Sequence, residues 1–386
     1  MTSREWFAGL MTGTVLDGQI DIAFIRTDGE VIMEFGPAEM ISYEDDLRGL
    51  IADAVTRARA WNFTGDEPDI FAVAERALTL AQAKAVMETA ASYDIALDDI
   101  AAIGFHGQTV LHRPPSDGLR GRTRQLGDGT LMADALGRPV VFDFRSADMA
   151  AGGHGAPLCP CYHAALLGHA GIGTNAAVLN LGGVGNITWR GDDGRLVAFD
   201  TGPANAPIND WVRIHGAGAM DRNGLIAASG IIDRDRLAQL MNLPYFSKPF
   251  PKSLDRNDFS SSLAEGMSLA DGAALLTALA AAAVARSVAS LPAPIDRLIV
   301  CGGGRHNPFL MRQIAEYADV TVETADGLGW RGDTVEAECF AFLAARHLAG
   351  LPVSHPGTTG VPSPMAAGRL VMPHSSVKLD QAGDIG

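Results

Sequence analysis

The chain contains the same strand and turn pattern twice, and this duplication constrains its fold more than any other feature. In the second copy, an apolar strand at 176–181 runs into Gly182-Gly183, and a second strand follows at 184–189. Asp192-Asp193-Gly194 is a hairpin signal. A third strand at 196–199 then delivers Asp200 into the turn Thr201-Gly202-Pro203. Taken alone, this segment also fits an ordinary Gly-rich β-meander.

The amino-terminal region repeats the design. Strands are predicted at 6–11, 20–25 and 31–35, with the Gly-, Thr- and Asp-rich turn 12–18 after the first and the hairpin turn 27–29 after the second. Two such copies suggest two similar lobes that grip a nucleotide between them. This is the layout of the actin and sugar-kinase fold.

The rest of the chain alternates helical and strand patterns, which indicates α/β architecture. Helices are predicted at 43–60, 70–92, 126–137, 208–215, 269–291 and 334–348, strands at 100–105, 139–142 and 298–300, and a Pro/Gly/Arg-rich loop at 113–124. We expect a boundary near Asp143, with an amino-terminal lobe at 1–143 and a carboxy-terminal lobe at 144–386.

Composition excludes several classes of function. The 386 residues suffice for two cores, and the net charge of −15 argues against binding to nucleic acid or to an anionic membrane. The first residues lack a signal peptide, and the apolar segment 270–291 is interrupted by Asp271 and Arg286, so it reads as a buried helix. We therefore expect a cytoplasmic protein. The four cysteines lack metal-site spacing: Cys159, Cys161, Cys301 and Cys339.

Two features carry phosphate and acid–base chemistry. Glycines that follow a strand let backbone N–H groups approach phosphate oxygens, and the neighbouring strand-end Asp200 can act as a base or hold a cation. Gly302-Gly303-Gly304 ends another strand. It would let the chain lie flat against an adenine or ribose, or form a simple strand-to-helix turn.

Assembled in order, these segments resemble the anhydro-N-acetylmuramic acid kinase family from about Gly9 to Gly368. The segments that carry the resemblance are GLMTGTVLDGQIDIA (9–23), IGFHGQTVLHRP (103–114), VVFDFRSADMAAGGHGAPLCPCYH (140–163), LNLGGVGNIT and FDTGPAN (within 179–205), PYFSKPFPKSLDRNDF (244–259), VCGGGRHN (300–307), DTVEAECFAFLAARHL (333–348) and PGTTGVP (356–362). The resemblance implies a two-lobed, actin-like (ribonuclease H-like) kinase. Its substrates would be ATP, water and 1,6-anhydro-N-acetylmuramate, and its product N-acetylmuramate 6-phosphate in cell-wall recycling.

The resemblance also implies roles for single residues. Asp200 matches the family's catalytic Asp, which would activate the water that opens the anhydro bridge, although an Asp there can also hold Mg²⁺ or cap a turn. The residues expected to bind ATP are Gly13, Thr14, Val15, Leu16, Asp17, Gly18, Gln19, Ile20, Gly182, Gly183, Gly202, Gly302, Gly303, Gly304 and Asn307. Mg²⁺ is expected with ATP, without assigned protein ligands.

Four residues are expected on the sugar side. Arg145 suits a carboxylate because its planar fork binds both oxygens, and it lies with Asp148 beside the loop 150–157. His106 and Gln108 follow a buried strand, where α/β folds often bind ligands, although a lone His is more often structural. Glu336 opens a helix, where an acid also favours the helix dipole.

The chain departs from the family pattern at three positions. Val15 stands where the family has a second Ser, Ala204 replaces a glycine, and Asn209 replaces an Asp. Ala204 would be costly if that glycine holds a conformation that other residues avoid. The departures leave open a kinase for another anhydro sugar such as levoglucosan, or a weakened sugar- or nucleotide-binding protein. Relatives suggest a homodimer.

Overall fold

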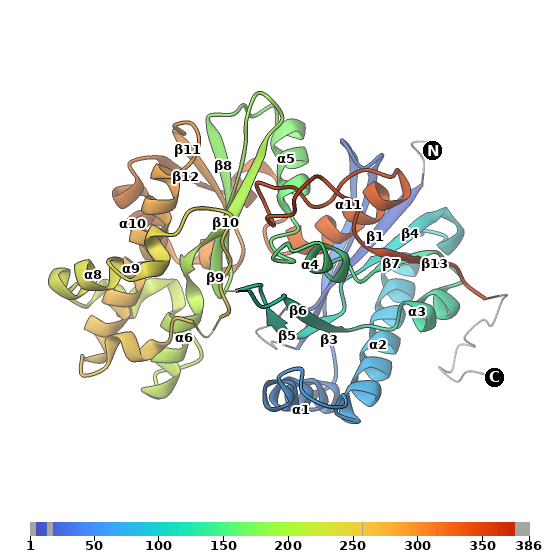
Figure 1. Cartoon of the computed structure of the whole chain (residues 1–386), viewed down its shortest axis with the longest axis horizontal. Coiled ribbons are helices and arrows are strands. Elements are labelled where there is room, and N and C mark those ends of the chain that lie inside the picture. The colour runs from blue at the N-terminus through green and yellow to red at the C-terminus, as the bar shows by residue number, and fades with distance from the viewer. Residues whose placement is uncertain (1–4, 14–17, 117, 257, 375–386) are drawn as a thin grey trace. The chain divides into compact units, whose positions relative to one another are not determined.

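The computed structural model describes residues 5–13, 18–116, 118–256 and 258–374. The chain divides into two compact units (Figure 1). The first unit comprises 1–169, 334–356 and 360–386, and the second comprises 170–333 and 357–359.

The first unit is built on a six-stranded sheet with the order β13-β7-β4-β1-β2-β3. The strands are β1 (Trp6–Met11), β2 (Gln19–Thr27), β3 (Ile32–Ser42), β4 (Ile100–Phe105), β7 (Val140–Phe142) and β13 (Arg369–Val371). A separate hairpin consists of β5 (Gln108–Arg113) and β6 (Arg122–Leu126). The helices are α1 (Asp45–Trp61), α2 (Ile70–Ser92), α3 (Gly129–Leu136), α4 (Ser146–Ala150), α5 (Pro160–His169) and α11 (Val335–Leu348), with a 3₁₀ turn at Leu97–Asp99.

The second unit has a five-stranded sheet with the order β10-β9-β8-β11-β12. Its strands are β8 (Ala176–Leu181), β9 (Val184–Arg190), β10 (Leu196–Pro203), β11 (Arg297–Cys301) and β12 (Thr321–Thr324). Its helices are α6 (Asn205–Ile214), α7 (Leu225–Ala228), α8 (Arg234–Met241), α9 (Leu269–Ala289) and α10 (Pro308–Ala318). Short 3₁₀ turns lie at Arg222–Gly224, Pro244–Ser247, Ser261–Ala264, Gly303–His306 and Ala325–Leu328.

The two sheets share one topology, which confirms the duplication expected from the sequence. In each, the first strand pairs antiparallel with the second and the second antiparallel with the third. The other side of the first strand pairs with a parallel strand, which pairs with another parallel strand. This arrangement is the ribonuclease H-like topology, and its presence in both halves confirms the actin-like fold class.

The carboxy-terminal helix α11 belongs to the first unit and packs directly on β1 and β4. A Cβ atom at Gly9 would lie 1.9 Å from the carbonyl oxygen of Ala337, and one at Gly104 would lie 1.9 Å from that of Phe340. Only glycine permits so close an approach of helix to sheet. The predicted division at 143/144 differs from the observed units in two ways: the first unit continues through residue 169, and the chain returns to it after residue 333 to cover the first sheet.

Helix α9 is the core helix of the second unit. It is long and apolar enough to cross a membrane by composition, but 72% of its most apolar window is buried inside the protein. Its Ala280, Ala281 and Val284 pack with strand residues such as Leu179 and Phe199. The buried-helix interpretation of this segment is confirmed.

Two local expectations are corrected. Asp200 lies within β10, which continues through Pro203 with an irregular register between Asp200 and Gly202, rather than in a turn after the strand. The predicted loop at 113–124 is part of the β5–β6 hairpin, because Arg122 begins β6 and pairs with Arg113. Proline and glycine occupy only the connection between these strands.

Candidate functional site

In the second unit, strand register aligns Asp200 with polar residues of two other strands. Asp200 of β10 pairs with Asn186 of β9, Asn186 pairs with Asn180 of β8, and Asn180 pairs with Cys301 of β11. Neighbouring strands lie about 4.8 Å apart, so this row spans roughly 15 Å. Both predicted glycine turns begin just beyond this row of paired residues. Gly182 lies two residues after Asn180, and Gly302 directly follows Cys301.

The turn Gly182-Gly183 is locked to the start of α6. Gly183 accepts hydrogen bonds at 3.1 Å from the amides of Ala204 and Ala206, and Gly182 accepts one at 3.1 Å from the amide of Asn205. The Asn205 side chain also donates from Nδ2 to the carbonyls of Leu181 and Gly182, each at 2.9 Å. These hydrogen bonds fix the turn against the start of α6.

The glycines 302–304 lie against the same strand end. Gly302 has φ of +77°, and a Cβ there would lie 2.3 Å from Asn180 Oδ1. A Cβ at Gly304 would lie 2.6 Å from Leu181 Cβ, whereas one at Gly303 would meet nothing within 4 Å. Gly302 and Gly304 thus serve close packing, and Gly303 is the glycine with open space beside it.

Arg305 holds this glycine turn to the segment 326–333. Its guanidinium donates to Asp326 at 2.6 and 3.3 Å, to Asp333 at 2.6 and 2.7 Å, and to the carbonyl of Gly302 at 3.2 Å. Burial alone would lower the pKa of Arg305, but the two carboxylates outweigh it and raise that pKa. In turn, Arg305 lowers the pKa values of Asp326 and Asp333.

Asp200 is 9% exposed, and its Oδ2 accepts a hydrogen bond from the amide of Leu254 at 2.8 Å. Its own amide donates to the carbonyl of Lys252 at 3.0 Å. A nearly buried carboxylate that is oriented by a backbone amide has the fixed geometry that a general base needs.

In the first unit, His106 and Arg145 form a buried pair. His106 Nδ1 lies 2.7 Å from the carbonyl of Gly107, so Nδ1 carries the proton, and Arg145 Nη2 donates to Nε2 at 3.0 Å. Burial, and secondarily the charge of Arg145, lower the pKa of His106 to about 3. His106 is therefore neutral near pH 7 and acts as an acceptor for Arg145.

The loop 150–157 is anchored from both sides. Arg145 Nη1 donates to the carbonyl of Gly155 at 2.7 Å, and Asp148 Oδ1 accepts from the amide of Gly155 at 2.7 Å. Gly155 has φ of +69°, and a Cβ there would lie 2.7 Å from Met149 Cγ. Arg145, which is expected on the sugar side, and Asp148 thus both hold the loop in shape.

Two buried polar atoms of this region have no hydrogen-bond partner within the described parts of the chain: Arg145 Nε and Gln108 Oε1. Gln108 Nε2 donates to the carbonyls of Gly13 and Thr109, at 3.4 and 3.3 Å. Glu336 is partly buried and raises the pKa of Arg145, against the larger lowering by burial. Unpartnered buried polar atoms are rare and indicate a ligand or an ordered water.

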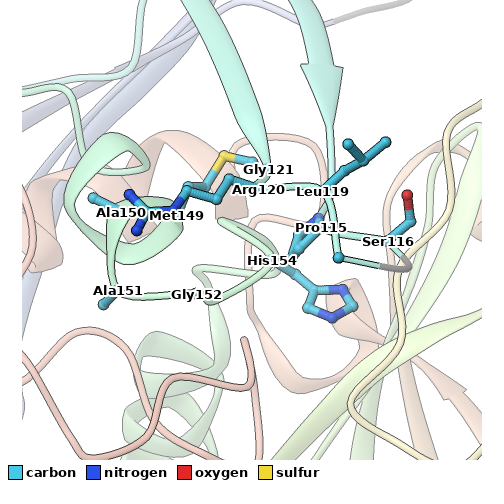
Figure 2. Close-up of a pocket in the computed structure, with 11 residues that line it drawn as sticks. Pro115, Ser116, Leu119, Arg120, Gly121, Met149, Ala150, Ala151, Gly152 and His154 are labelled. Carbon is cyan, nitrogen blue, oxygen red and sulfur yellow. The ribbon is translucent and has the colours of Figure 1, made fainter.

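A hollow of about 580 Å³ borders the same loop (Figure 2). Its lining comes from the β5–β6 connection on one side, including Leu119 and Arg120, and from 149–152 with His154 on the other. Burial lowers the pKa of His154, while Asp148 raises it.

Several residues expected at the nucleotide have other tasks. Ile20 is 2% exposed in the first core, Gly202 lies where a Cβ would meet Ala283 at 2.8 Å, and Asn307 caps α10 by accepting from the amide of Leu310 at 3.0 Å. Ile20 thus serves packing, Gly202 permits close packing against Ala283, and Asn307 caps a helix. Gln19 opens β2, and Gly13 and Gly18 flank the first turn. Thr14, Val15, Leu16 and Asp17 lie outside the described residues.

The predictions missed three residues near the two glycine turns of the second unit, 182–183 and 302–304. These residues are Asn205, Arg256 and Arg305. The side-chain carbon Cδ of Arg256 would lie 4.0 Å from a Cβ at Gly183, and its Nη2 donates to Asp210 at 3.2 Å. Arg305 directly follows the triple glycine, so its place in the motif was a signal. Arg256 is far from the turn in sequence and gave no such signal.

Of the departures, Ala204 lies at the start of α6, where its amide donates a hydrogen bond to the carbonyl of Gly183. Its φ of −127° and ψ of −112° lie outside the left-handed region and also outside the main β and right-handed α regions of non-glycine residues. The expectation that this position is costly for a residue with a Cβ therefore stays a prediction. Asn209 lies in α6 next to Asp210, and Asp210 accepts hydrogen bonds from Arg213 and Arg256.

The duplicated topology defines the class of protein first: an actin-like fold with glycine turns beside a fixed carboxylate. A model of the anhydro-N-acetylmuramic acid kinase family matches residues 5–373. The chain belongs to this family. The anhydro-N-acetylmuramic acid kinase of Rhizobium rhizogenes is 57% identical over 365 residues, covering 95% of this chain and 98% of the relative. That of Mesorhizobium japonicum is 55% identical over the same shares.

Among solved structures, an activator of 2-hydroxyisocaproyl-CoA dehydratase from Clostridium difficile with bound ADPNP aligns with a TM-score of 0.44 at 13% identity. The alignment covers 89% of this chain and 97% of the activator.

Proposed function

We propose that this protein uses ATP to open 1,6-anhydro-N-acetylmuramate and phosphorylate O6, with Asp200 as the general base. The chain's membership of the anhydro-N-acetylmuramic acid kinase family supports the reaction. The single structural observation that supports the base is the placement of Asp200, oriented by the amide of Leu254 and in register with the strand ends that carry both glycine turns.

Asp200 takes a proton from water as the water oxygen bonds to C1 of the sugar. The bond between C1 and O6 breaks, and O6 bonds to the γ-phosphorus as ADP leaves. The turns at 182–183 and 302–304 would bind the nucleotide through backbone groups, since phosphoryl transfer requires positioning and charge neutralisation.

On the sugar side, Arg145, His106, Gln108 and Glu336 would bind the substrate. The unpartnered Nε of Arg145 and Oε1 of Gln108 supply a donor and an acceptor for its hydroxyl or carboxylate groups. His106 is kept neutral by burial and orients Arg145 rather than exchanging protons.

Mg²⁺ would enter with ATP. Among the residues that the structure describes, no three His, Cys, Asp or Glu side chains gather as a metal site. Mg²⁺ commonly keeps several waters and binds through substrate phosphates with one or two protein carboxylates, so the proposed Mg²⁺ does not require a group of three such residues. A cytoplasmic homodimer remains the proposed form of the protein.

Asp200→Asn should retain both ligands and lose most of kcat, because an amide keeps the shape but cannot accept the proton of water. The expected loss is about 10²–10⁴-fold, in kcat and kcat/KM together. Calorimetry with ATP and with sugar measures the retained binding, and steady-state rates across a magnesium series measure the loss of kcat. Asp192→Asn, in the exposed hairpin between β9 and β10, is the matched control and should behave as wild type.

Normal turnover by Asp200→Asn would show that Asp200 takes no part in the chemistry. If the variant instead binds Mg·ATP weakly and added magnesium restores the binding, Asp200 is a metal ligand. The sugar is tested by ADP release with anhydro-N-acetylmuramate, levoglucosan and N-acetylmuramate side by side. Anhydro-N-acetylmuramate should turn over, with label from ¹⁸O water at C1, and ring-opened N-acetylmuramate should not; turnover of levoglucosan would favour the alternative substrate. Equal turnover of ring-opened N-acetylmuramate would contradict the coupled opening.

A further inference from the structure

The segment between α8 and α9 contacts Asp200 at several points and is not explained by packing alone. The Tyr245 hydroxyl donates to the backbone carbonyl of Asp200 at 2.6 Å. The Leu254 amide donates to the carboxylate at 2.8 Å, and the Lys252 carbonyl accepts from the amide of Asp200 at 3.0 Å. Both backbone groups and the side chain of Asp200 are therefore held by one segment.

Lys252 is the unusual member of this segment, because it is a lysine with only 8% exposure. Its ammonium lies 4.6 Å from the ring centre of Tyr245 and 5.6 Å from that of Phe199, the neighbour of Asp200 in β10. Its Nζ also donates to the carbonyl of Tyr245 at 3.3 Å. A buried ammonium over aromatic rings is retained at a cost, so it requires a compensating interaction.

The charges around Lys252 identify that interaction. Burial lowers the pKa of Lys252, and the nearby cations Arg286 of α9 and Lys248 lower it further, whereas Asp200 raises it. Burial raises the pKa of Tyr245, and Asp200 and Asp258 raise it further, so its hydroxyl remains a donor. Among the groups that shift the pKa of Lys252, Asp200 is the one carboxylate, and the ammonium lies over Tyr245, whose hydroxyl bonds Asp200, and near Phe199, which precedes Asp200 in β10.

We propose that Lys252 is a positioning residue for Asp200. With Tyr245 and Leu254 it forms a bracket that fixes the direction of the carboxylate, and its charge keeps that carboxylate ionised in a nearly buried place. The inference rests on the proposed role of Asp200 as the base. In this proposal the base Asp200 depends on the positive charge of Lys252, a residue of the same unit.

Lys252→Met tests the charge while keeping the length of the side chain. It should lower kcat about tenfold with KM values for ATP and anhydro-N-acetylmuramate within about twofold, and move the acidic limb of the pH–kcat profile upward by about one pH unit. Lys252→Arg keeps a cation and should restore the wild-type limb. Lys84→Met, the same change at an exposed lysine of α2 in the first unit, should leave rate and profile unchanged.

Tyr245→Phe separates position from charge, because it removes the hydroxyl and keeps the ring under Lys252. It should lower kcat several-fold without moving the limb. If Lys252→Met does not fold, Lys252→Gln is measured in the same way.

If the acidic limb of the pH–kcat profile does not move in a folded Lys252 variant, the proposal is overturned, whether kcat falls or not. A purely structural role of Lys252 could lower kcat but would not shift that limb. A raised KM for ATP at unchanged kcat also overturns it and makes Lys252 a nucleotide contact. Failure here is distinct from failure of the proposed function: if Asp200→Asn loses kcat while Lys252→Met does not, the base remains and only the bracket is lost.

Discussion

At the scale of single residues, burial decides what His106 can do. A histidine in a polar loop commonly titrates near neutrality, but His106 is 5% exposed and next to the guanidinium of Arg145, and its pKa falls to about 3. The imidazole therefore accepts a hydrogen bond from Arg145 throughout the physiological range. This makes His106 part of the support for the sugar side.

The same shift predicts how stability depends on pH. Between about pH 6.5 and 3, His106 binds a proton when unfolded but not when folded, so the unfolded state binds more protons and the free energy of unfolding falls as pH falls. His106→Gln removes this term. Its loss of stability between pH 7 and pH 5 should be about 2 kcal/mol smaller than that of the wild type, measured by urea unfolding. An equal loss in both proteins would contradict the shift.

At the scale of elements, the contact of α11 with the first sheet depends on glycine. Helix and strands approach until backbone atoms touch, and the two glycines at the contact, Gly9 and Gly104, lie in neighbouring strands β1 and β4 in direct register. Any side chain at either position would separate the helix from the sheet. Cys161 and Cys339, which also belong to the first unit, are buried free thiols.

Gly104→Ala should therefore destabilise the protein by at least about 3 kcal/mol, because its Cβ would lie 1.9 Å from the carbonyl oxygen of Phe340. Gly49→Ala is the matched control. Gly49 lies within α1, where a Cβ would meet nothing within 4 Å, so alanine should add about 0.5–1 kcal/mol of stability. Denaturant unfolding of both variants measures the difference. Equal effects would show that the helix can move away from the sheet.

At the scale of the whole molecule, the two units differ in how the chain builds them. The second unit is nearly continuous, from 170 to 333, and adds only 357–359. The first unit is assembled from both ends of the chain, because β13 adds an edge strand to the sheet that contains β1 and α11 packs on that sheet. Each unit has its own buried core.

This difference predicts the behaviour of fragments. A fragment of residues 170–333 should fold alone, since it contains the whole second unit except 357–359. Residues 1–169 should not fold until residues 334–373 are joined to them, because the face of β1 and β4 under α11 would be exposed. Circular dichroism and thermal unfolding of the three fragments test this. A cooperative transition for 1–169 alone would contradict it.

The sequence by itself determined the duplicated strands, the glycine turns and the family, because hydrophobic period and turn residues act over a few neighbours. It did not predict the short strands β5, β6, β12 and β13. It also placed Asp200, His106 and Arg145 in motifs. Tertiary structure decided what those motifs contact. The partners of Asp200 come from residues 245–254, the clamp on Gly302 comes from Asp326 and Asp333, and α11 crosses the predicted boundary to close the first unit. These contacts join segments distant in the chain, and local propensity carries no record of them.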